Sequence, residues 1–457
     1  MEQQNHFTQG KILSPLIRFC FPVLLALFLQ AMYGAVDMII VGKFAKTADI
    51  SAVATGSQIL HAITGVLTGL ATGVTVLLGQ RIGEGRNRDA GRVMGAGIFL
   101  FSVLAVALTI LFVACSGLIA QVMQAPKDAF EETVSYVRIC SAGTVFIIAF
   151  NLVGSIFRGM GDSKMPLITV AIACVVNIAG DLLLCAVLDL GAAGAAIATV
   201  FAQAVSVVLS LLIIARRPIP FTFQKADIRP DRALVGGILR LGTPIAFQEL
   251  LVSISFLVIM AIVNDLGLTE SAGIGVAEKI CAFIMLIPAA YMQSMSAFVA
   301  QNIGAGKPER AKKALLYGIL TSLAAGVVMC WVSVFHGDLL ASVFANEKED
   351  PAVILAAAEY LKAYGIDCLF TAFLFCFIGY FSGLGKTLFV MVQGVVGAFC
   401  VRVPVSFFMS RLEPISLFRI GMATPASTVV QILLCGGFFL LLHRREQSRN
   451  RTLREVL

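Results

Sequence analysis

Long apolar runs recur along the whole chain and are separated by short polar or glycine-rich segments. About 20 consecutive apolar residues let a helix cross a bilayer, and many of these runs reach or exceed that length. The longest runs predict helices that are tilted or kinked. We therefore predict an all-α integral membrane fold with twelve transmembrane helices, over residues 15–41, 51–79, 93–114, 133–156, 165–188, 191–215, 234–263, 271–299, 314–335, 353–380, 387–410 and 416–443.

The composition agrees with this pattern. Of the 457 residues, 58% are hydrophobic and only 13% are charged, which is too little charge to cover the surface of a soluble protein of this size. The eleven cysteines occur singly, without a CxxC pair or a Cys/His cluster, so we expect them to be small packing residues. The polar start, MEQQNHFTQGKILSPL, has no cleavable signal pattern, and we expect the first span to stay in the mature protein.

The basic residues predict an orientation. The N-terminus up to Arg18, the tail and the loops after the even-numbered spans hold 23 of the 34 lysines and arginines, whereas the opposite loops, with Arg419 counted in the last of them, hold six. Positive loops remain in the cytoplasm, so we expect both termini there, in a multi-pass protein of the plasma membrane. The net charge of +7 follows from this topology, and we expect no nucleic-acid partner.

An internal repeat divides the chain into two halves. Three landmarks recur at an offset of 221 to 224 residues: GQRIGEGRNRDA (79–90) with AQNIGAGKPERA (300–311), FRGMGD (157–162) with FSGLGK (381–386), and Pro22 with Pro244. The first pair follows the second span of each half, the second pair follows the fourth span, and the two prolines lie near the start of the first and seventh spans. Parallel repeats of this kind imply a pseudo-twofold axis along the membrane normal and a central cleft, which is typical of a transporter.

The repeat also predicts the domain organisation. We expect an N-terminal six-helix lobe over residues 1–215 and a cytoplasmic linker over residues 216–233. A C-terminal six-helix lobe follows over residues 234–443, and residues 444–457 form a basic cytoplasmic tail.

Four polar residues of the N-terminal half lie within apolar spans. A carboxylate at the middle of a membrane helix costs about 2.5–3.5 kcal/mol or more, so Asp37 is either an interfacial acid near a helix end or a site for a proton or cation. Asn177 and Asp181 have i,i+4 spacing and share one helix face, which suggests an oxygen cage or a proton site. Small residues in GAAGAAIAT let the fifth and sixth spans approach closely, which would bring Thr199 toward Asp181 unless its hydroxyl bonds its own backbone.

The C-terminal half holds further acids. Glu249 follows Pro244 by five residues, and a proline kink frees backbone groups that can line a cavity, so we predict that Glu249 faces substrate or a proton there. Glu278, Asp367 and Arg402 are weaker candidates.

No pattern indicates an enzyme. GYFSGLGKT (379–387) resembles a phosphate loop, but its first glycine is one residue early and no strand precedes it. No GxSxG or HExxH motif occurs, and a membrane-embedded enzyme would need a clustered catalytic set near one interface. We predict that the chain is not an enzyme and that no cofactor is needed.

The sequence resembles the multidrug and toxic compound extrusion (MATE) family, of the bacterial drug-efflux type, over nearly its whole length. The resemblance rests on FPVLLALFLQAMYGAVDMIIVGKF in the first span, QRIGEGR after the second, FRGMGDSKMP before the fifth, and NIAGDLLL followed by Thr199 eighteen residues after Asp181. It implies a polar cluster for sodium or proton coupling at Asp37, Asn177, Asp181 and Thr199.

The resemblance also implies roles for single residues. Pro22 matches a proline linked to bending of the first helix, and Gln30 matches a cavity glutamine. We expect Tyr33, on the same helix, to line the substrate cavity together with Gln30 and Glu249. Glu249 matches an acid of the seventh span that some members use. Those members also use an acid in the tenth span, and there the match fails, because the spacing from Asp367 to SGLG is too long.

The implied function is secondary active export by alternating access. We expect a monomer that exports organic, mostly cationic amphipathic compounds in exchange for protons or sodium ions. Besides these substrates, we expect it to interact only with the coupling ion and the lipid bilayer. A flippase for lipid-linked saccharides of the same superfamily is the alternative. That function predicts more cavity arginines, whereas Arg402 is the only basic residue placed deep in a span.

Overall fold

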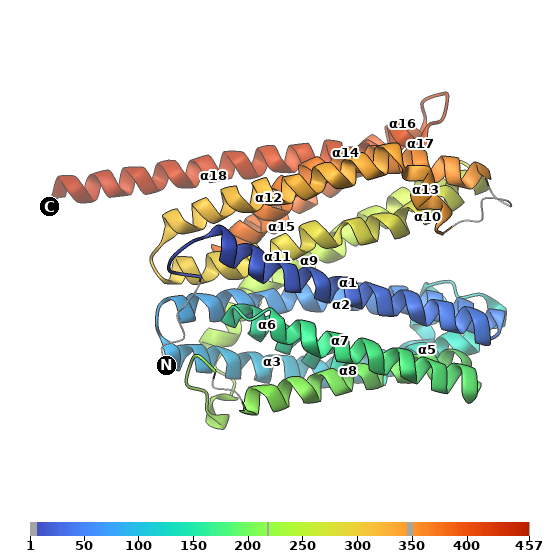
Figure 1. The fold of residues 1–457 in the computed structure, drawn as a ribbon, viewed down its shortest axis with the longest axis horizontal. Coiled ribbons are helices and arrows are strands. Elements are labelled where there is room, and N and C mark those ends of the chain that lie inside the picture. The colour runs from blue at the N-terminus through green and yellow to red at the C-terminus, as the bar shows by residue number, and fades with distance from the viewer. Residues whose placement is uncertain (1–6, 217–218, 345–350, 457) are drawn as a thin grey trace. The chain divides into compact units, whose positions relative to one another are not determined.

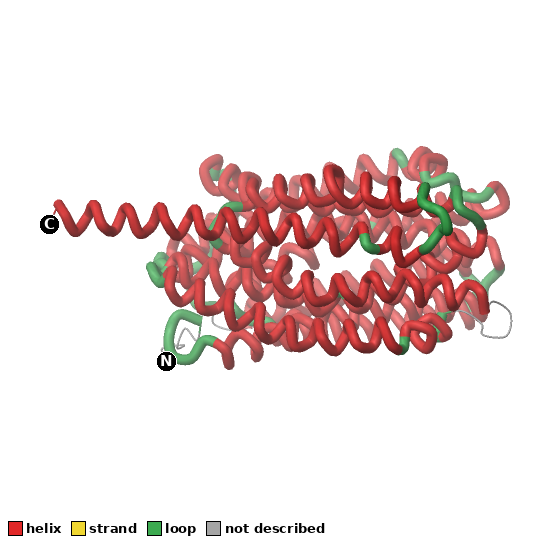
Figure 2. The backbone as a smooth tube through the Cα atoms, turned by 90° about the horizontal axis from the view of Figure 1, so that it is seen from above, coloured by secondary structure: helices red, strands yellow, loops and turns green. Residues whose placement is uncertain are grey.

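The computed structural model describes residues 7–216, 219–344 and 351–456, and in this part the chain is helical and contains no strand (Figure 2). Eleven of its helices are long and apolar enough to cross a membrane, and a bent pair brings the number to twelve. The predicted all-α fold with twelve spans is therefore confirmed. Small parts of the predicted N-terminal lobe (1–6), linker (217–218), C-terminal lobe (345–350) and tail (457) lie outside the described residues.

The described spans follow the predicted order (Figure 1). In the first half they are α1 (Leu13–Phe44), α2 (Thr47–Gly83), α3 (Asn87–Ala114), the pair α5 (Phe130–Ala142) and α6 (Thr144–Met160), α7 (Lys164–Asp181) with η2 (Leu182–Val187), and α8 (Gly191–Arg216). In the second half they are α9 (Arg232–Asn264), α10 (Leu268–Ile284) with α11 (Leu286–Gly304), α12 (Pro308–Phe335), α14 (Pro351–Gly383), α15 (Thr387–Val395) with η4 (Val396–Arg402) and α16 (Val403–Ser410), and α17 (Leu417–Gly421) with α18 (Ala423–Val456). The short helices α4 (Ser116–Val122), η1 (Lys127–Ala129), η3 (Lys225–Asp227) and α13 (Gly337–Ser342) lie in connections.

The fourth span, which the sequence predicts over 133–156, is bent. The helix that contains α5 and α6 breaks at Gly143 with an angle of 50°. A Cβ atom at Gly143 would overlap the side chain of Val200 on α8. The glycine thus lets α8 pack against the backbone at the break, a contact between helices that the local pattern of apolar residues does not encode.

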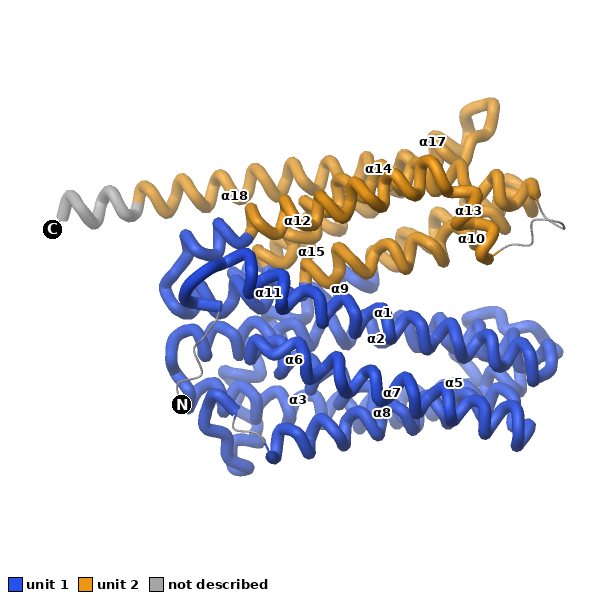
Figure 3. Tube along the Cα trace, in the orientation of Figure 1, with its two compact units in different colours: residues 1–250, 293–314, 382–387 blue, residues 251–292, 315–381, 388–457 orange. Residues whose placement is uncertain are grey.

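The chain divides into two compact units (Figure 3). Unit 1 contains residues 1–250, 293–314 and 382–387, and unit 2 contains residues 251–292, 315–381 and 388–457. Unit 1 therefore holds the six spans of the first half together with the ends of several helices from the second half.

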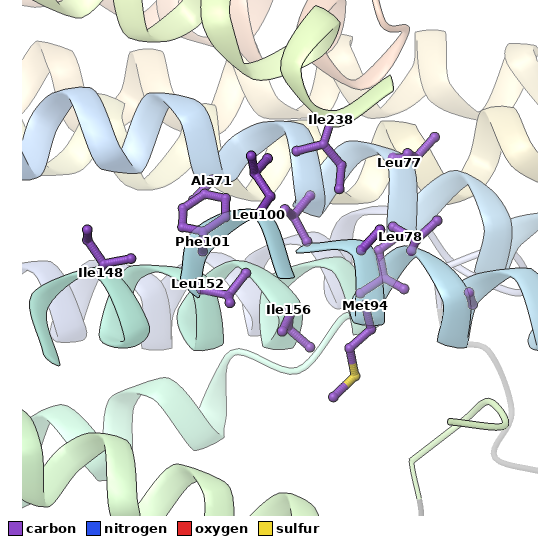
Figure 4. Close-up of a cluster of buried hydrophobic side chains, with 14 of the residues drawn as sticks. Ala71, Leu77, Leu78, Met94, Leu100, Phe101, Ile148, Leu152, Ile156 and Ile238 are labelled. Atoms are coloured by element: carbon purple, nitrogen blue, oxygen red, sulfur yellow. The ribbon is translucent and has the colours of Figure 1, made fainter. Parts of the chain in front are cut away.

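The apolar core of unit 1 lies where α2, α3, α6 and α9 meet (Figure 4). Leu78, Phe101, Ile148, Leu152 and Ile238 are almost completely buried in it. Each large side chain removed from lipid and packed there contributes dispersion contacts that fix the angle between its helices. This core holds α2 and α6, which line the cavity described below.

The repeated motifs meet within unit 1. The side-chain amide of Gln80 donates a hydrogen bond to the Gly383 carbonyl at 3.1 Å, and that of Gln301 donates one to the Gly159 carbonyl at 2.8 Å. These two bonds are related by the repeat, since Gln80 and Gln301 stand at the same place in their motifs. We call this pair of bonds the crossed glutamine contact.

Two glycines make the crossed glutamine contact possible. A Cβ atom at Gly83 would overlap the Gln301 carbonyl, and one at Gly304 would overlap the Gln80 carbonyl. The ends of α2 and α11 therefore touch backbone to backbone. The repeat motif found in the sequence is a packing motif that joins the two helices at the end of unit 1 where α1 begins.

The described part of the linker is docked on α3. Asp227 forms an ion pair with Arg88 at 2.8 Å and accepts a hydrogen bond from the Gln224 amide at 2.8 Å. Burial opposes ionisation of Asp227, but the bonds from Gln224 and Arg88 outweigh it and hold the pKa of this carboxyl below its usual range. The backbone of Thr222 and of Asp227 lies directly over Gly91 and Gly95, where a side chain would overlap it.

Candidate functional site

Asp37 lies on α1 and is buried, with 6% of its surface exposed. The hydroxyl of Thr199 on α8 donates a hydrogen bond to Asp37 Oδ2 at 3.2 Å. The sequence predicts that the Thr199 hydroxyl lies near Asp181, whereas in the structure it contacts the Asp37 carboxylate on α1. A charge-assisted bond of this kind holds the orientation of the acid against the helix that carries the hydroxyl.

Asn177 and Asp181 face this carboxylate from α7. Both are fully buried, and both interact with Asp37. Their i,i+4 spacing places them on one face, as the sequence predicts. The structure thus brings Asp37, Asn177, Asp181 and Thr199 together in unit 1; we call these four residues the acid cluster.

Close helix packing positions the acid cluster. A Cβ atom at Gly180 would lie 3.0 Å from the Ala198 side chain, so α7 and α8 touch one residue before Asp181 and one residue before Thr199. The start of α8 is fixed by Asp49, whose carboxylate accepts a hydrogen bond from the Ala192 amide at 2.8 Å. Such a bond also suits the positive end of the helix dipole.

A π-helical turn follows the cluster at once. η2 begins at Leu182, directly after Asp181. Single π turns in α-helices widen the helix locally and often occur at functional sites. The sequence NIAGDLLL gives no sign of this turn, and its counterpart η4 in the second half ends at Arg402.

The cluster has the chemistry of a site for a hard cation or a proton. Within the described residues, Asp37 Oδ1, both polar atoms of the Asn177 amide and both oxygens of Asp181 have no hydrogen-bond partner. Buried polar groups are normally satisfied, and two buried carboxylates cannot both remain ionised at low cost. Oxygen atoms from two carboxylates, an amide and a hydroxyl suit Na⁺, and a shared proton would serve as well. The described part of the chain has no group of three or more His, Cys, Asp or Glu, the usual ligands of a transition metal.

A cavity of about 80 Å³ lies elsewhere in unit 1. Its polar lining includes Gln30, Thr68, Asn151, Arg158, Ser163 and Ser210, contributed by α1, α2, α6, α8 and the turn before α7. Gln30 is thus in a cavity, as the resemblance implies for it. The sequence analysis does not identify Arg158 as a cavity residue. Arg158 belongs to FRGMGD, and the predicted end of the fourth span at residue 156 places it in the following loop.

The other residues expected at a substrate cavity lie apart from it. Tyr33 lies near Gln203 and Asp37, and Glu249 is half-buried on α9; neither lines the cavity described above. Pro22 is buried inside α1, which runs without a break from Leu13 to Phe44. The proline is therefore accommodated in a continuous helix in this structure.

Unit 2 holds the three weaker candidates. Arg402 is buried at the end of η4, donates a hydrogen bond to the Ser255 hydroxyl at 3.1 Å and lies 4.4 Å from the centre of the Phe256 ring. Asp367 on α14 is buried beside Thr428, and its charge interacts with that of Arg402. Among the described residues no carboxylate lies within 4.0 Å of the Arg402 guanidinium. Glu278 on α10 is half-buried.

The chain is similar to known proteins along nearly its whole length. The MatE family model matches residues 22–183 and 244–408, one stretch in each half. The probable multidrug resistance protein YoeA of Bacillus subtilis (strain 168) is 26% identical over 444 residues, which cover 94% of each chain. The multidrug export protein MepA of Staphylococcus saprophyticus is 22% identical over 416 residues, which cover 90% of each chain. A solved structure described as the outward-facing conformation of a multidrug resistance MATE family transporter has the same fold, with a TM-score of 0.90, 20% identity and 99% of each chain covered.

Proposed function

Because this chain belongs to the MATE family of multidrug efflux transporters, and is not an enzyme, we propose that it exchanges organic cations for protons or sodium ions. The coupling ion binds at the acid cluster, and the substrates are mostly cationic, amphipathic compounds. The observation that carries the proposal is the hydrogen bond from Thr199 to Asp37 beside a second buried carboxylate, Asp181.

The acid cluster joins three helices, which gives it a means to control shape. Asp37 belongs to α1, Asp181 to α7 and Thr199 to α8. When a proton or Na⁺ binds between the two carboxylates, it offsets one of their two negative charges. Their repulsion then falls and the three helices are drawn together; when the ion leaves, they separate. A ligand shifts a conformational equilibrium by its difference in affinity for the two states, so the ion favours the state in which the cluster is closed.

Movement of α1 would then change the shape of the cavity, because α1 contributes part of its lining. Gln30 lies on α1 between Pro22 and Asp37, and it lines the cavity. A proline lacks the backbone N–H of a regular turn, which lowers the cost of bending the helix at that position. We propose that α1 bends at Pro22 when the ion binds and that the change in cavity shape expels the substrate.

The size of the cavity limits what it can hold in this conformation. At about 80 Å³ it is smaller than the 300–1,000 Å³ typical of sites for drug-sized ligands. The cavity therefore accepts one group of a substrate, and the rest must be accommodated in another state of the transport cycle. Glu249, half-buried on α9, is the acid we assign to the cationic group of the substrate.

In the proposed topology, the twelve spans cross the plasma membrane and both termini lie in the cytoplasm. We propose that a monomer is sufficient for transport. The support is the bias of basic residues toward one side. A reporter fused after Leu457 should read as cytoplasmic, and an external reading would contradict the topology.

One experiment tests the proposed exchange. The purified chain is placed in lipid vesicles, and the movement of a cationic dye is followed under a proton gradient alone and under a sodium gradient alone. Movement against the dye gradient in at least one of the two conditions supports the proposal and identifies the ion. A chain that equilibrates the dye without responding to either gradient would not be an ion-coupled antiporter.

A further inference from the structure

Arg158 is placed in an unusual way for a residue near the end of a membrane helix. It lies in the last turn of α6, which ends at Met160, and it is half-buried. An arginine in such a position usually extends toward the polar end of the helix. Here the side chain turns back instead: a Cβ atom on Gly154 would lie 3.2 Å from Arg158 Nη1 and 4.0 Å from Cζ.

Gly154 therefore makes room for the guanidinium one helical turn before Arg158. At 3.2 Å the contact is tighter than ordinary van der Waals packing, so a larger residue at this position would displace the charged group. The guanidinium thus lies alongside the helix and lines the cavity that also contains Gln30 and Asn151.

The guanidinium has no anionic partner in the part of the chain that the structure describes. No Asp or Glu lines the cavity, and no ion pair or hydrogen bond of Arg158 is formed with any described residue. A half-buried cation without a partner is costly, and a guanidinium has five N–H donors arranged for two oxygen atoms at once.

Two polar neighbours of Arg158 in the cavity, Asn151 and Thr169, already have hydrogen-bond partners. Asn151 accepts a hydrogen bond from Thr68 at 2.8 Å and donates one to the Ile147 carbonyl at 2.9 Å. Thr169 donates to backbone carbonyls of its own helix, at 3.1 Å and 3.2 Å. Gln30, Ser163, Ser210 and Gln293 also line the cavity, and among its lining residues Arg158 is the one charged donor.

We propose that Arg158 binds the acidic group, a carboxylate or phosphate, of an amphiphile that enters this cavity. Two oxygen atoms of one group match the guanidinium, and Ser163 and Ser210 line the same cavity with hydroxyls. By a measure of about 10–15 Å³ for each water, the cavity has room for about six waters, which is enough for such a head group but too little for a whole drug. The acidic group belongs either to a transported zwitterion or to an anionic lipid.

The inference rests on the proposed function only in treating this cavity as part of the substrate path, since binding at Arg158 needs no ion gradient. The test therefore uses binding to the purified full-length chain in nanodiscs. The probes are a rhodamine dye with a free carboxylate and its ethyl ester, which differ in that group alone. The variants are Arg158→Gln, Arg158→Lys and Gly154→Ala, with Arg18→Gln, which removes an exposed arginine of α1, as the control.

In discs of neutral lipid, Arg158→Gln should weaken binding of the acid dye by about tenfold or more and leave the ester unchanged. Arg158→Lys should give a smaller loss because the charge remains, and Gly154→Ala should resemble it because the guanidinium is displaced. Arg18→Gln should bind both dyes like the unchanged chain. Equal weakening of both dyes, or no weakening of either, would overturn the inference, provided that the variants elute as single species from size-exclusion chromatography.

A second arm separates the two sources of the acidic group. If it comes from lipid, phosphatidylglycerol in the discs should compete with the acid dye in the unchanged chain but not in Arg158→Gln. If it comes from the transported compound, the acid dye should bind equally well in both lipids. A chain that binds the acid dye through Arg158 but does not respond to ion gradients would keep this inference and contradict the proposed exchange.

Discussion

The Thr199 hydroxyl donates a hydrogen bond to Asp37 Oδ2 at 3.2 Å, so α8 and α1 meet at the carboxylate assigned to the coupling ion. Thr199→Ala removes this donor and one ligand of the proposed site. The free energy lost on removing a hydrogen bond to a charged group is about 1.5–3 kcal/mol, so we expect the apparent affinity for the coupling ion to fall about tenfold or more while export continues. The measurement is dye efflux as a function of proton or sodium concentration, with Thr199→Ser as the control that keeps the hydroxyl. An unchanged concentration dependence in Thr199→Ala would show that this bond does not serve the ion.

Asp37 and Asp181 should act as one unit, because each interacts with the other in a buried site. Asp181→Asn should abolish gradient-driven export, and the double variant with Asp37→Asn should be little worse than either single one. Groups that share one function show this non-additive behaviour, whereas independent sites add. Residual export rates of the two single variants and the double variant provide the check. If the fold-losses in export rate of the two single variants multiply in the double variant, the two carboxylates bind separate ions.

The crossed glutamine contact makes a prediction about movement. Gln301→Ala should leave the Gly159 carbonyl without its donor, at a cost of about 1 kcal/mol, which favours separation of α11 from α6 about fivefold. Gln80→Ala should likewise favour separation of α2 from α14 by removing the bond to Gly383. Hydrogen–deuterium exchange should rise over residues 298–304 in Gln301→Ala and over residues 78–83 in Gln80→Ala.

The exposed Gln121 on α4 gives a matched control for this prediction. Gln121→Ala should exchange like the unchanged chain over residues 78–83 and 298–304. If the two contact variants also exchange like the unchanged chain, the glutamines do not hold these helices together.

The ion pair of Asp227 with Arg88 predicts a pH dependence for the linker. The pKa of Asp227 is lowered in the folded chain, so its contribution is complete above the unfolded value of about 3.9 and is lost as the pH falls through the folded value. Arg88 is 44% exposed, so we expect docking of the linker to lose about 1 kcal/mol at pH 7 in Asp227→Asn. Hydrogen exchange of residues 219–228, corrected for intrinsic rates, should increase below pH 4 in the unchanged chain. In Asp227→Asn it should already be increased at pH 7, and an unchanged rate there would contradict the prediction.

The spans could be predicted because transfer into a bilayer depends on the composition of about 20 consecutive residues. The bend at Gly143 could not, because it arises from Val200 on another helix. The sequence likewise gives the packing residues of α7 and α8 but not the direction of Thr199, which depends on how α1 approaches them.

Arg158 shows the same limit in the cavity. Its position before the turn residues of FRGMGD indicates a loop, whereas the helix continues to Met160 and the side chain lies over Gly154. The place of a long side chain depends on the space left by its neighbours, which a single sequence does not encode. Sequence patterns therefore found the residues of the acid cluster but not the arginine of the cavity.

The most direct measurement of the central claim, that Asp37 binds the coupling ion, is efflux by Asp37→Asn in vesicles with an imposed proton or sodium gradient. The asparagine resembles the permanently protonated acid, so the variant should fold and bind dye but fail to move it against its gradient. Asp128→Asn, which alters an exposed acid of η1, should transport like the unchanged chain. If Asp37→Asn, at normal expression, still exports dye against its gradient, the ion is bound elsewhere and the central claim is contradicted.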